Sequence, residues 1–147
     1  RIDDFVSISS KKSLVIGNNV HIGSFSYIAG EEDIEICDNV WISQGVRIYS
    51  TIDDFFGLGL AGPMVDISFR KVYSKKVLLQ KYSLIGSGSV ILPGVTIGYN
   101  SAVSAMSLVN ESIAPNKLAI GIPAKEKMNR SNIGIKKYES RGKDENC

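Results

Sequence analysis

An aliphatic residue returns at every sixth position through most of this chain of 147 residues. The second residue of each six-residue unit is often Gly, Ala or Ser, and the fifth is small or β-branched. The aliphatic positions are Ile16, Ile22, Ile28, Ile36, Ile42, Ile48, Leu79, Ile85, Ile91, Ile97, Val103 and Val109. This period matches neither an amphipathic helix nor simple strand alternation, so it indicates a repeat architecture.

Such a repeat predicts an all-β fold, a parallel β-helix. Each hexad forms a short strand and a tight corner, and three hexads close one triangular coil. The aliphatic residues then stack along the axis as a dry core, and the small residues occupy the crowded corners. The repeat spans about 14–114, which predicts one β-helix domain over 1–130 and a C-terminal tail or short helix over 131–147.

The six-residue repeat is interrupted twice. Eight residues replace six between Ile28 and Ile36, which predicts a bulge at one corner. After the hexad 48–53 the six-residue repeat is absent until about Val77, which predicts a long irregular loop over about 54–76. Loops of this length are uncommon in compact domains unless they carry function.

Composition excludes several classes of partner. Lys and Arg number 17 against 15 Asp and Glu, and no basic patch with interleaved aromatic residues occurs, so a nucleic-acid partner is not expected. Positive charges gather late in the chain, where a small polyanionic ligand could bind. Cys37 and Cys147 do not form a disulfide framework, and no apolar segment is long enough to span a bilayer. We expect free thiols, no membrane insertion and a cytoplasmic location.

Two segments resemble the coenzyme-A-binding coils of the hexapeptide-repeat sugar acyltransferases, notably the maltose and galactoside acetyltransferase group. They are IGSGSVILPGVTIGYNSAVSAMSLV at 85–109 and GIPAK at 121–125. The resemblance implies a left-handed coil, a homotrimer and acetyl-CoA as acyl donor, without a metal. It also implies that Ser87 and Ala105 line the pantetheine arm and that Lys125 contacts the nucleotide phosphates, with Lys127 or Arg130 as a second cation.

His21 is one candidate for proton handling. It is the single histidine of the chain and should point outward from the coil. With an ordinary pKa near ~6.5, an imidazole is suited to general-base catalysis. The alternative is a surface or interface imidazole stacked beside Trp41 of the adjacent coil.

Asp53 is the second candidate. The resemblance to galactoside-type acetyltransferases places it where those enzymes have a catalytic histidine, at the entry to the long loop. A solvent-exposed aspartate is a poor base for a sugar hydroxyl but can hold an amino group, together with a backbone carbonyl near Ser43. The S-x-x-D-D run at 50–54 resembles enzymes that acylate nucleotide-linked dideoxy amino sugars. The alternative is an Asp pair that opens a loop.

Tyr49, Phe55, Phe56 and Tyr82 could form an aromatic wall for a sugar face, or pack the loop onto a neighbouring subunit. Ser43, Tyr49, Asp54 and Phe55 are therefore the predicted substrate-binding residues. Outward Trp41, Tyr27 and Leu84 need cover, which also favours a trimer.

The sequence therefore favours an acetyl-CoA-dependent N-acyltransferase acting on a nucleotide-linked amino sugar for surface polysaccharide. The main alternative is an O-acetyltransferase of a sugar hydroxyl, with His21 as base. One histidine per chain cannot supply the three zinc ligands of a carbonic anhydrase of this fold. A purely structural β-helix needs neither the coenzyme pattern nor the loop.

Overall fold

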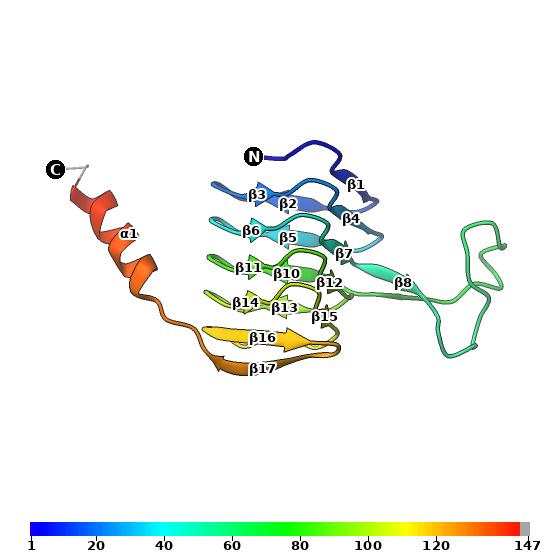
Figure 1. Ribbon diagram of the computed structural model, residues 1–147. Coiled ribbons are helices and arrows are strands. Elements are labelled where there is room, and N and C mark those ends of the chain that lie inside the picture. Colours follow the sequence, from blue (N-terminus) through cyan, green and yellow to red (C-terminus); the bar gives the residue numbers. More distant parts are fainter. Residues whose placement is uncertain (145–147) are drawn as a thin grey trace.

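The computed structural model describes residues 1–144, whose strands wind into a left-handed parallel β-helix (Figure 1). The hexads predicted the parallel β-helix, and the family resemblance predicted its hand. Each coil contributes one strand to each of three faces. The first face consists of β1 (Ser7–Ser10), β4 (Tyr27–Gly30), β7 (Arg47–Tyr49), β12 (Val90–Ile91) and β15 (Leu108–Val109). The second consists of β2 (Leu14–Ile16), β5 (Ile34–Ile36), β10 (Val77–Leu79) and β13 (Thr96–Ile97). The third consists of β3 (His21–Ile22), β6 (Trp41–Ile42), β11 (Leu84–Ile85), β14 (Ala102–Val103), β16 (Lys117–Gly121) and β17 (Ala124–Asn129).

The strand register places like residues of successive hexads on top of one another. On the first face Ile28 pairs with Ile48, Ile48 with Ile91, and Ile91 with Val109. Eleven of the twelve predicted aliphatic positions are buried. The exception is Ile16, which is 36 % exposed because its coil lies near the N-terminal end of the stack, where less of the chain covers it.

The coil begins earlier than the predicted residue 14. Strand β1 pairs in parallel with β4, and Ile2 forms an isolated bridge with Ile22. Ile2 and Ile8 are six residues apart, and eight residues separate Ile8 from Ile16, as they separate Ile28 from Ile36. This longer interval interrupts the six-residue spacing and obscured the first coil in the sequence.

Small residues at the corners are a steric requirement of the stacking. A Cβ added to Gly86 would lie 2.4 Å from the backbone N of Ala105 in the next coil. At Gly30 it would lie 2.0 Å from the Ser50 hydroxyl, and φ is +146° there. Gly30 starts the predicted bulge between Ile28 and Ile36, which is confirmed as a corner.

The interruption after Ile48 differs from its prediction as an irregular loop. The chain leaves the coil at once as β8 (Thr51–Asp53) and returns as β9 (Val72–Ser74), which pair as an antiparallel ribbon. The ribbon and the loop at 54–71 project from the corner between the first and second faces (Figure 1). We call residues 51–74 the excursion.

The C-terminal end closes the coil with a hairpin. Strand β17 folds back antiparallel on β16, and the helix α1 (Ile133–Asp144) follows on the side of the third face (Figure 1). Within residues 1–144, no helix has the length and apolar character needed to cross a membrane. Cys37 is a free thiol whose pKa is raised by burial, and Cys147 lies outside the described residues.

Candidate active site

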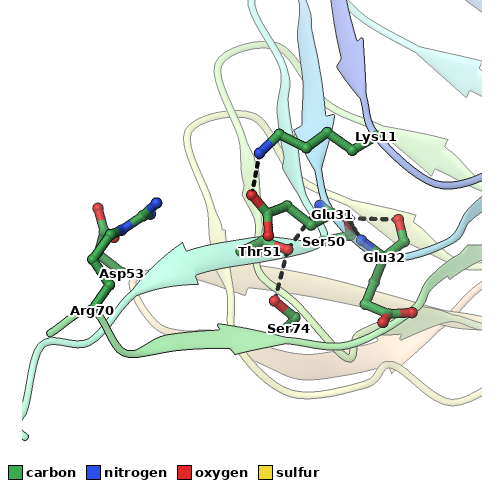
Figure 2. A network of polar contacts seen from close by, with 8 residues as sticks. All are labelled: Lys11, Glu31, Glu32, Ser50, Thr51, Asp53, Arg70 and Ser74. Atoms are coloured by element: carbon green, nitrogen blue, oxygen red, sulfur yellow. Dashed lines mark hydrogen bonds and ion pairs between the residues drawn. The ribbon is translucent and has the colours of Figure 1, made fainter. Parts of the chain in front are cut away.

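Asp53 ends β8, at the point where the excursion leaves the coil. Its Oδ1 accepts a hydrogen bond from Nη2 of Arg70 at 3.2 Å, across the ribbon (Figure 2). The Asp53 side chain is 36 % exposed, so it is half-buried and ion-paired rather than fully solvent-exposed as predicted. Oδ2 has no hydrogen-bond partner among residues 1–144, so it can accept one from a ligand.

A polar network fixes the base of the excursion to the coil (Figure 2). The buried Ser50 hydroxyl donates to the Glu32 carbonyl at 2.8 Å and accepts from the Glu32 N–H at 3.2 Å. Thr51 Oγ1 accepts from the Glu31 N–H and contacts the Ser74 hydroxyl, each at 2.9 Å. Ser50 and Thr51, which precede Asp53 by three and two positions, are therefore held by the preceding coil and give the aspartate a rigid support.

Asp54 organises the first turn of the loop. Its carboxylate accepts backbone hydrogen bonds from Phe56 at 3.0 Å, from Leu58, and from Gly59 at 3.1 Å. The Phe56 hydrogen bond and the two others hold the pKa of Asp54 below its ordinary value. This is the loop-opening use of an Asp that the sequence left open. The substrate contact assigned to Asp54 stays a prediction.

Two hollows meet at Asp53. One, of about 280 Å³, is lined by Tyr49, Thr51, Ile52, Asp53, Arg70 and Val72. The other, of about 330 Å³, is lined by Ile52, Asp53, Asp54, Phe55, Phe56, Leu58, Lys71, Val72 and Tyr73. The ribbon thus presents Asp53 to a mixed polar hollow and to a largely apolar one. Tyr49, Phe55 and Phe56 lie here as predicted.

Tyr82 does not belong to this aromatic wall, contrary to the sequence prediction. It lies at the corner between the second and third faces, packs edge-to-face on Tyr99, and donates to Glu139 of α1 at 2.9 Å. Partial burial and the Glu139 carboxylate raise the pKa of Tyr82 to about 12. Tyr82 lies at this corner because it is in the turn between β10 and β11, outside the excursion.

His21 lies on the third face, away from the excursion (Figure 1). Its Nε2 is 2.8 Å from Asp3 Oδ2, and its ring packs edge-on against Trp41, with the ring centroids 5.5 Å apart. The His21 hydrogen bond lowers the pKa of Asp3. The hollow beside His21 shares no lining residue with either hollow beside Asp53. Within one chain, the two predicted catalytic residues are therefore not brought together.

The predicted pantetheine residues share the corner between the third and first faces. Ser43 and Gln44 precede β7, and Ser87 and Ala105 follow them in successive coils. The backbone N–H groups of Gln44, Ser87 and Ala105 have no hydrogen-bond partner among residues 1–144. An unpaired column of amides is able to pair with an extended ligand that carries carbonyl groups.

The Ser43 carbonyl is already used inside this corner. It accepts a hydrogen bond from the buried Ser26 hydroxyl at 3.1 Å. Ser87 makes a side-chain contact in the same column, since its hydroxyl donates to Gln44 Oε1 at 3.2 Å. Side-chain hydrogen bonds therefore connect successive coils at this corner. In the predicted role, the Ser43 carbonyl has to accept a second hydrogen bond, from the amine, besides that of Ser26.

The predicted phosphate-binding cations occupy the closing hairpin. Lys125 and Lys127 lie on β17 and are exposed, and Lys125 forms an ion pair with Glu111 at 3.0 Å. Arg130, the alternative second cation, has part of its guanidinium engaged within the coil, and its phosphate contact stays a prediction. Its Nη1 donates to the carbonyls of Tyr82 and Ser101, each at 3.2 Å, and burial lowers its pKa. Arg130 thus connects the backbone of two successive coils, at Tyr82 and at Ser101.

Arg70 is the functional candidate that the sequence reading missed. It lies 17 positions from Asp53 inside an irregular segment, so only the antiparallel pairing of β8 and β9 brings them together. The nearest available signal in the sequence was a long excursion bounded by one acidic and one basic cluster, which is too weak to assign a pair.

The protein-family model described as the hexapeptide repeat of succinyl-transferase matches residues 13–50 and 82–106. The dTDP-4-amino-4,6-dideoxy-D-glucose acyltransferase of Escherichia coli is 34% identical over 132 residues, which cover 89% of this chain and 69% of that protein. The galactoside O-acetyltransferase of Escherichia coli K12 is 36% identical over 118 residues, which cover 74% of this chain and 53% of that protein.

Among solved structures, AntD, an N-acyltransferase from Bacillus cereus in complex with dTDP and 3-hydroxybutyryl-CoA, superposes with a TM-score of 0.93. It is 36% identical, and the match covers 100% of this chain and 78% of AntD. A serine variant of AntD in complex with dTDP-4-amino-4,6-dideoxyglucose and coenzyme A gives a TM-score of 0.92 at 35% identity, over 98% of this chain and 76% of that one. Other AntD structures carry a substitution of an aspartate ten positions after that serine.

Proposed function

Because this chain belongs to the hexapeptide-repeat acyltransferase family, we propose that it transfers an acyl group from acyl-CoA to the amino group of a nucleotide-linked amino sugar. The observation that carries the proposal is the carboxylate of Asp53. One of its oxygens is bound to Arg70, and the other has no partner among the described residues. Acetyl-CoA is the simplest donor of this class, and a precursor of surface polysaccharide is the product we expect.

A carboxylate at this position suits acylation of an amine better than acylation of an alcohol, because the alcohol needs a base. A free amine is already nucleophilic, so its nitrogen can attack the thioester carbonyl once it is held in place. The carbon–sulfur bond then breaks, and the proton that the nitrogen sheds goes to the departing thiolate, which becomes the thiol of coenzyme A. Asp53 has to accept a hydrogen bond from the amine and orient its lone pair, which needs no proton transfer to the aspartate.

The spacing of residues in AntD variants supports this assignment. The serine and the aspartate substituted in those structures are ten positions apart. In this chain, only one serine precedes an aspartate by ten positions, and the two residues are Ser43 and Asp53. Both are predicted site residues.

Coenzyme A is assigned to the corner between the third and first faces. The unpaired N–H groups of Gln44, Ser87 and Ala105 can pair with the two amide carbonyls of pantetheine and with the thioester. Lys125 and Lys127 on β17 then lie at the end of the column for the nucleotide phosphates, where Lys contacts are favourable.

A homotrimer completes the site in this proposal. Ser43 lies before β7 and Asp53 lies after it, and β7 alone is about 10 Å long for its three residues. Within a single chain, the proposed thioester corner and the proposed amine-binding carboxylate are therefore apart. A second copy that packs its excursion against this corner brings them together, and it also covers the exposed aromatic residues of the loop.

O-acetylation of a sugar hydroxyl is the second candidate, favoured by the similarity to the galactoside O-acetyltransferase. It requires a base, and His21 is the one histidine of the sequence. The Asp3 contact orients the His21 imidazole, as a base requires. This candidate assigns the acceptor to the hollow that His21 lines with Trp41, and not to the hollows beside Asp53.

Thiol release from acetyl-CoA separates the two candidates. The purified protein is assayed with dTDP-4-amino-4,6-dideoxyglucose and with the matched sugar that carries a hydroxyl in place of the amine. N-acylation predicts release with the amine alone. Release with the hydroxyl sugar at an equal or higher rate would identify an O-acyltransferase.

A further inference from the structure

The geometry points to Arg70 as a positioning residue that aims Asp53 at the acceptor amine and so sets the preference for amines over hydroxyls. This inference rests on the proposed function. Arg70 donates to Oδ1 of Asp53 and leaves Oδ2 without a partner among the described residues, and both residues line a hollow with Tyr49. A carboxylate held in this way presents one acceptor oxygen in one direction and offers no proton to donate.

The loop is built to hold Arg70 at this place. The Leu60 N–H donates to the Phe69 carbonyl at 2.8 Å, and Leu60 forms a bridge with Arg70. A Cβ at Gly59 would lie 2.6 Å from the Lys71 side chain, so a glycine is needed for the two segments to approach. The carboxylate of Asp54 ties the same turn through its backbone contacts. Both ends of the loop thus converge on the residues beside Arg70.

The burial of Arg70 is unusual for a residue that only pins a surface loop. Its side chain is 19 % exposed, and its Nε is buried without a hydrogen-bond partner among the described residues. Leaving a guanidinium donor unpaired in this way costs free energy. Exposed ion pairs elsewhere, such as Lys76 with Glu35 at 2.6 Å, carry no such cost. A partly desolvated Arg also interacts with its partner more strongly than an exposed cation does.

An amine and a hydroxyl place different demands on this carboxylate. A neutral amine can donate one N–H to Oδ2 and still direct its lone pair at the thioester. A hydroxyl that donates its only O–H to Oδ2 needs that proton removed before its oxygen becomes a strong nucleophile. Because Arg70 already donates to Oδ1, the carboxylate offers Oδ2 as a hydrogen-bond acceptor, which suits the amine and does not remove the hydroxyl proton.

A double-mutant cycle tests the inference. We compare Arg70→Gln, Asp53→Asn and the double variant by kcat/KM for dTDP-4-amino-4,6-dideoxyglucose at saturating acetyl-CoA. Arg70→Gln alone should lower kcat/KM by about tenfold, as expected for loss of a charge-assisted hydrogen bond. In the Asp53→Asn background the same change should alter it less than twofold, because Arg70 acts through Asp53. Arg70→Lys should recover part of the loss.

Controls separate positioning from folding. Lys76→Gln removes a cation from an ion pair on the same side of the coil and should leave kcat/KM unchanged. The KM for acetyl-CoA and the melting temperature should not change in Arg70→Gln. A second measurement, binding of the amino sugar nucleotide and of its hydroxyl analogue, should show that Arg70→Gln weakens binding of the amine only.

An unchanged kcat/KM in Arg70→Gln would overturn the inference, as would an equal loss in both backgrounds. In either case the wild-type protein still acylates the amine, so the proposed function stands. A wild-type protein that acylates no amine would remove the proposed function and this inference with it.

Discussion

The coil and the excursion are stabilised in different ways, although they are covalently continuous. The coil stacks fully buried aliphatic residues such as Ile42, Ile85 and Ile91, and most of its internal polar groups pair between coils. The excursion has no comparable core, and Phe55, Phe56 and Met64 are more than four-fifths exposed. It is held by hydrogen bonds and ion pairs at its base. A rigid repeat thus supplies stability and the corner that we propose for the coenzyme, and the excursion supplies the carboxylate that we propose for the acceptor.

The largest expected effect concerns the coil. Ile85→Ala removes a fully buried side chain between two stacked coils and should lower the free energy of unfolding by about 2–5 kcal/mol. Urea or thermal denaturation followed by circular dichroism measures this loss. Phe56→Ala in the exposed loop is the matched control and should change stability by less than about 0.5 kcal/mol. Equal losses in the two variants would contradict the division between coil and excursion.

The next effect concerns activity without stability. Asp53→Asn removes the charge of the carboxylate that we propose to accept a hydrogen bond from the amine. It should lower kcat/KM for the amino sugar by about 10- to 100-fold, as expected for a hydrogen bond to a charged group. Thermal unfolding should stay within a degree or two of the wild type. His21→Asn is the comparison variant and should reduce kcat/KM by less than about twofold. The opposite ranking of the two variants would favour the O-acetyltransferase alternative.

A smaller effect is expected at the closing hairpin. Lys125→Ala should raise the KM for acetyl-CoA by about three- to fivefold, because an exposed cation contributes little against solvent and must first leave Glu111. Titration calorimetry with coenzyme A and dephospho-coenzyme A locates the contact. A loss confined to coenzyme A assigns Lys125 to the 3′-phosphate, whereas equal losses remove that assignment.

The smallest effect is a local response to acid. The pKa of Asp54 is lowered by its backbone hydrogen bonds, first of all that from Phe56. A carboxyl with a depressed folded-state pKa adds stability above its ordinary value of 3.8, and this contribution is lost as the pH falls through the lowered value. The loop should therefore become sensitive to an acid-active protease such as pepsin below about pH 4 while the coil remains protected. Asp54→Asn should show the same loop cleavage at neutral pH with a neutral protease. Cleavage of coil and loop together would contradict local loosening.

The sequence predicted the coil well because steric repetition determines it. Ile22, Ile48 and Val109 could be assigned to one core from spacing alone, since each coil repeats the environment of the previous one. The first coil was missed because the eight-residue interval between Ile8 and Ile16 interrupts the six-residue spacing. The reversal that forms β17 was missed because an antiparallel hairpin breaks the period that made the other strands visible.

The site was predictable only in part. Asp53 could be found because it is the last residue of the last regular hexad before the excursion, and Ser87 and Ala105 because they repeat at one corner. Arg70 could not, since its contact with Asp53 depends on where an irregular loop returns. The positions of Tyr82 and Arg130 also depend on long-range packing, against Glu139 and against the carbonyls of the third face.

The most direct test of the central claim is thiol release from acetyl-CoA with a matched pair of nucleotide sugars that differ only in an amine or a hydroxyl at the acceptor position. Amine-dependent release that is lost in Asp53→Asn and retained in His21→Asn is the result predicted from the ion-paired carboxylate. Release with the hydroxyl sugar that depends on His21 and not on Asp53 would contradict the assignment of the acceptor site to the excursion.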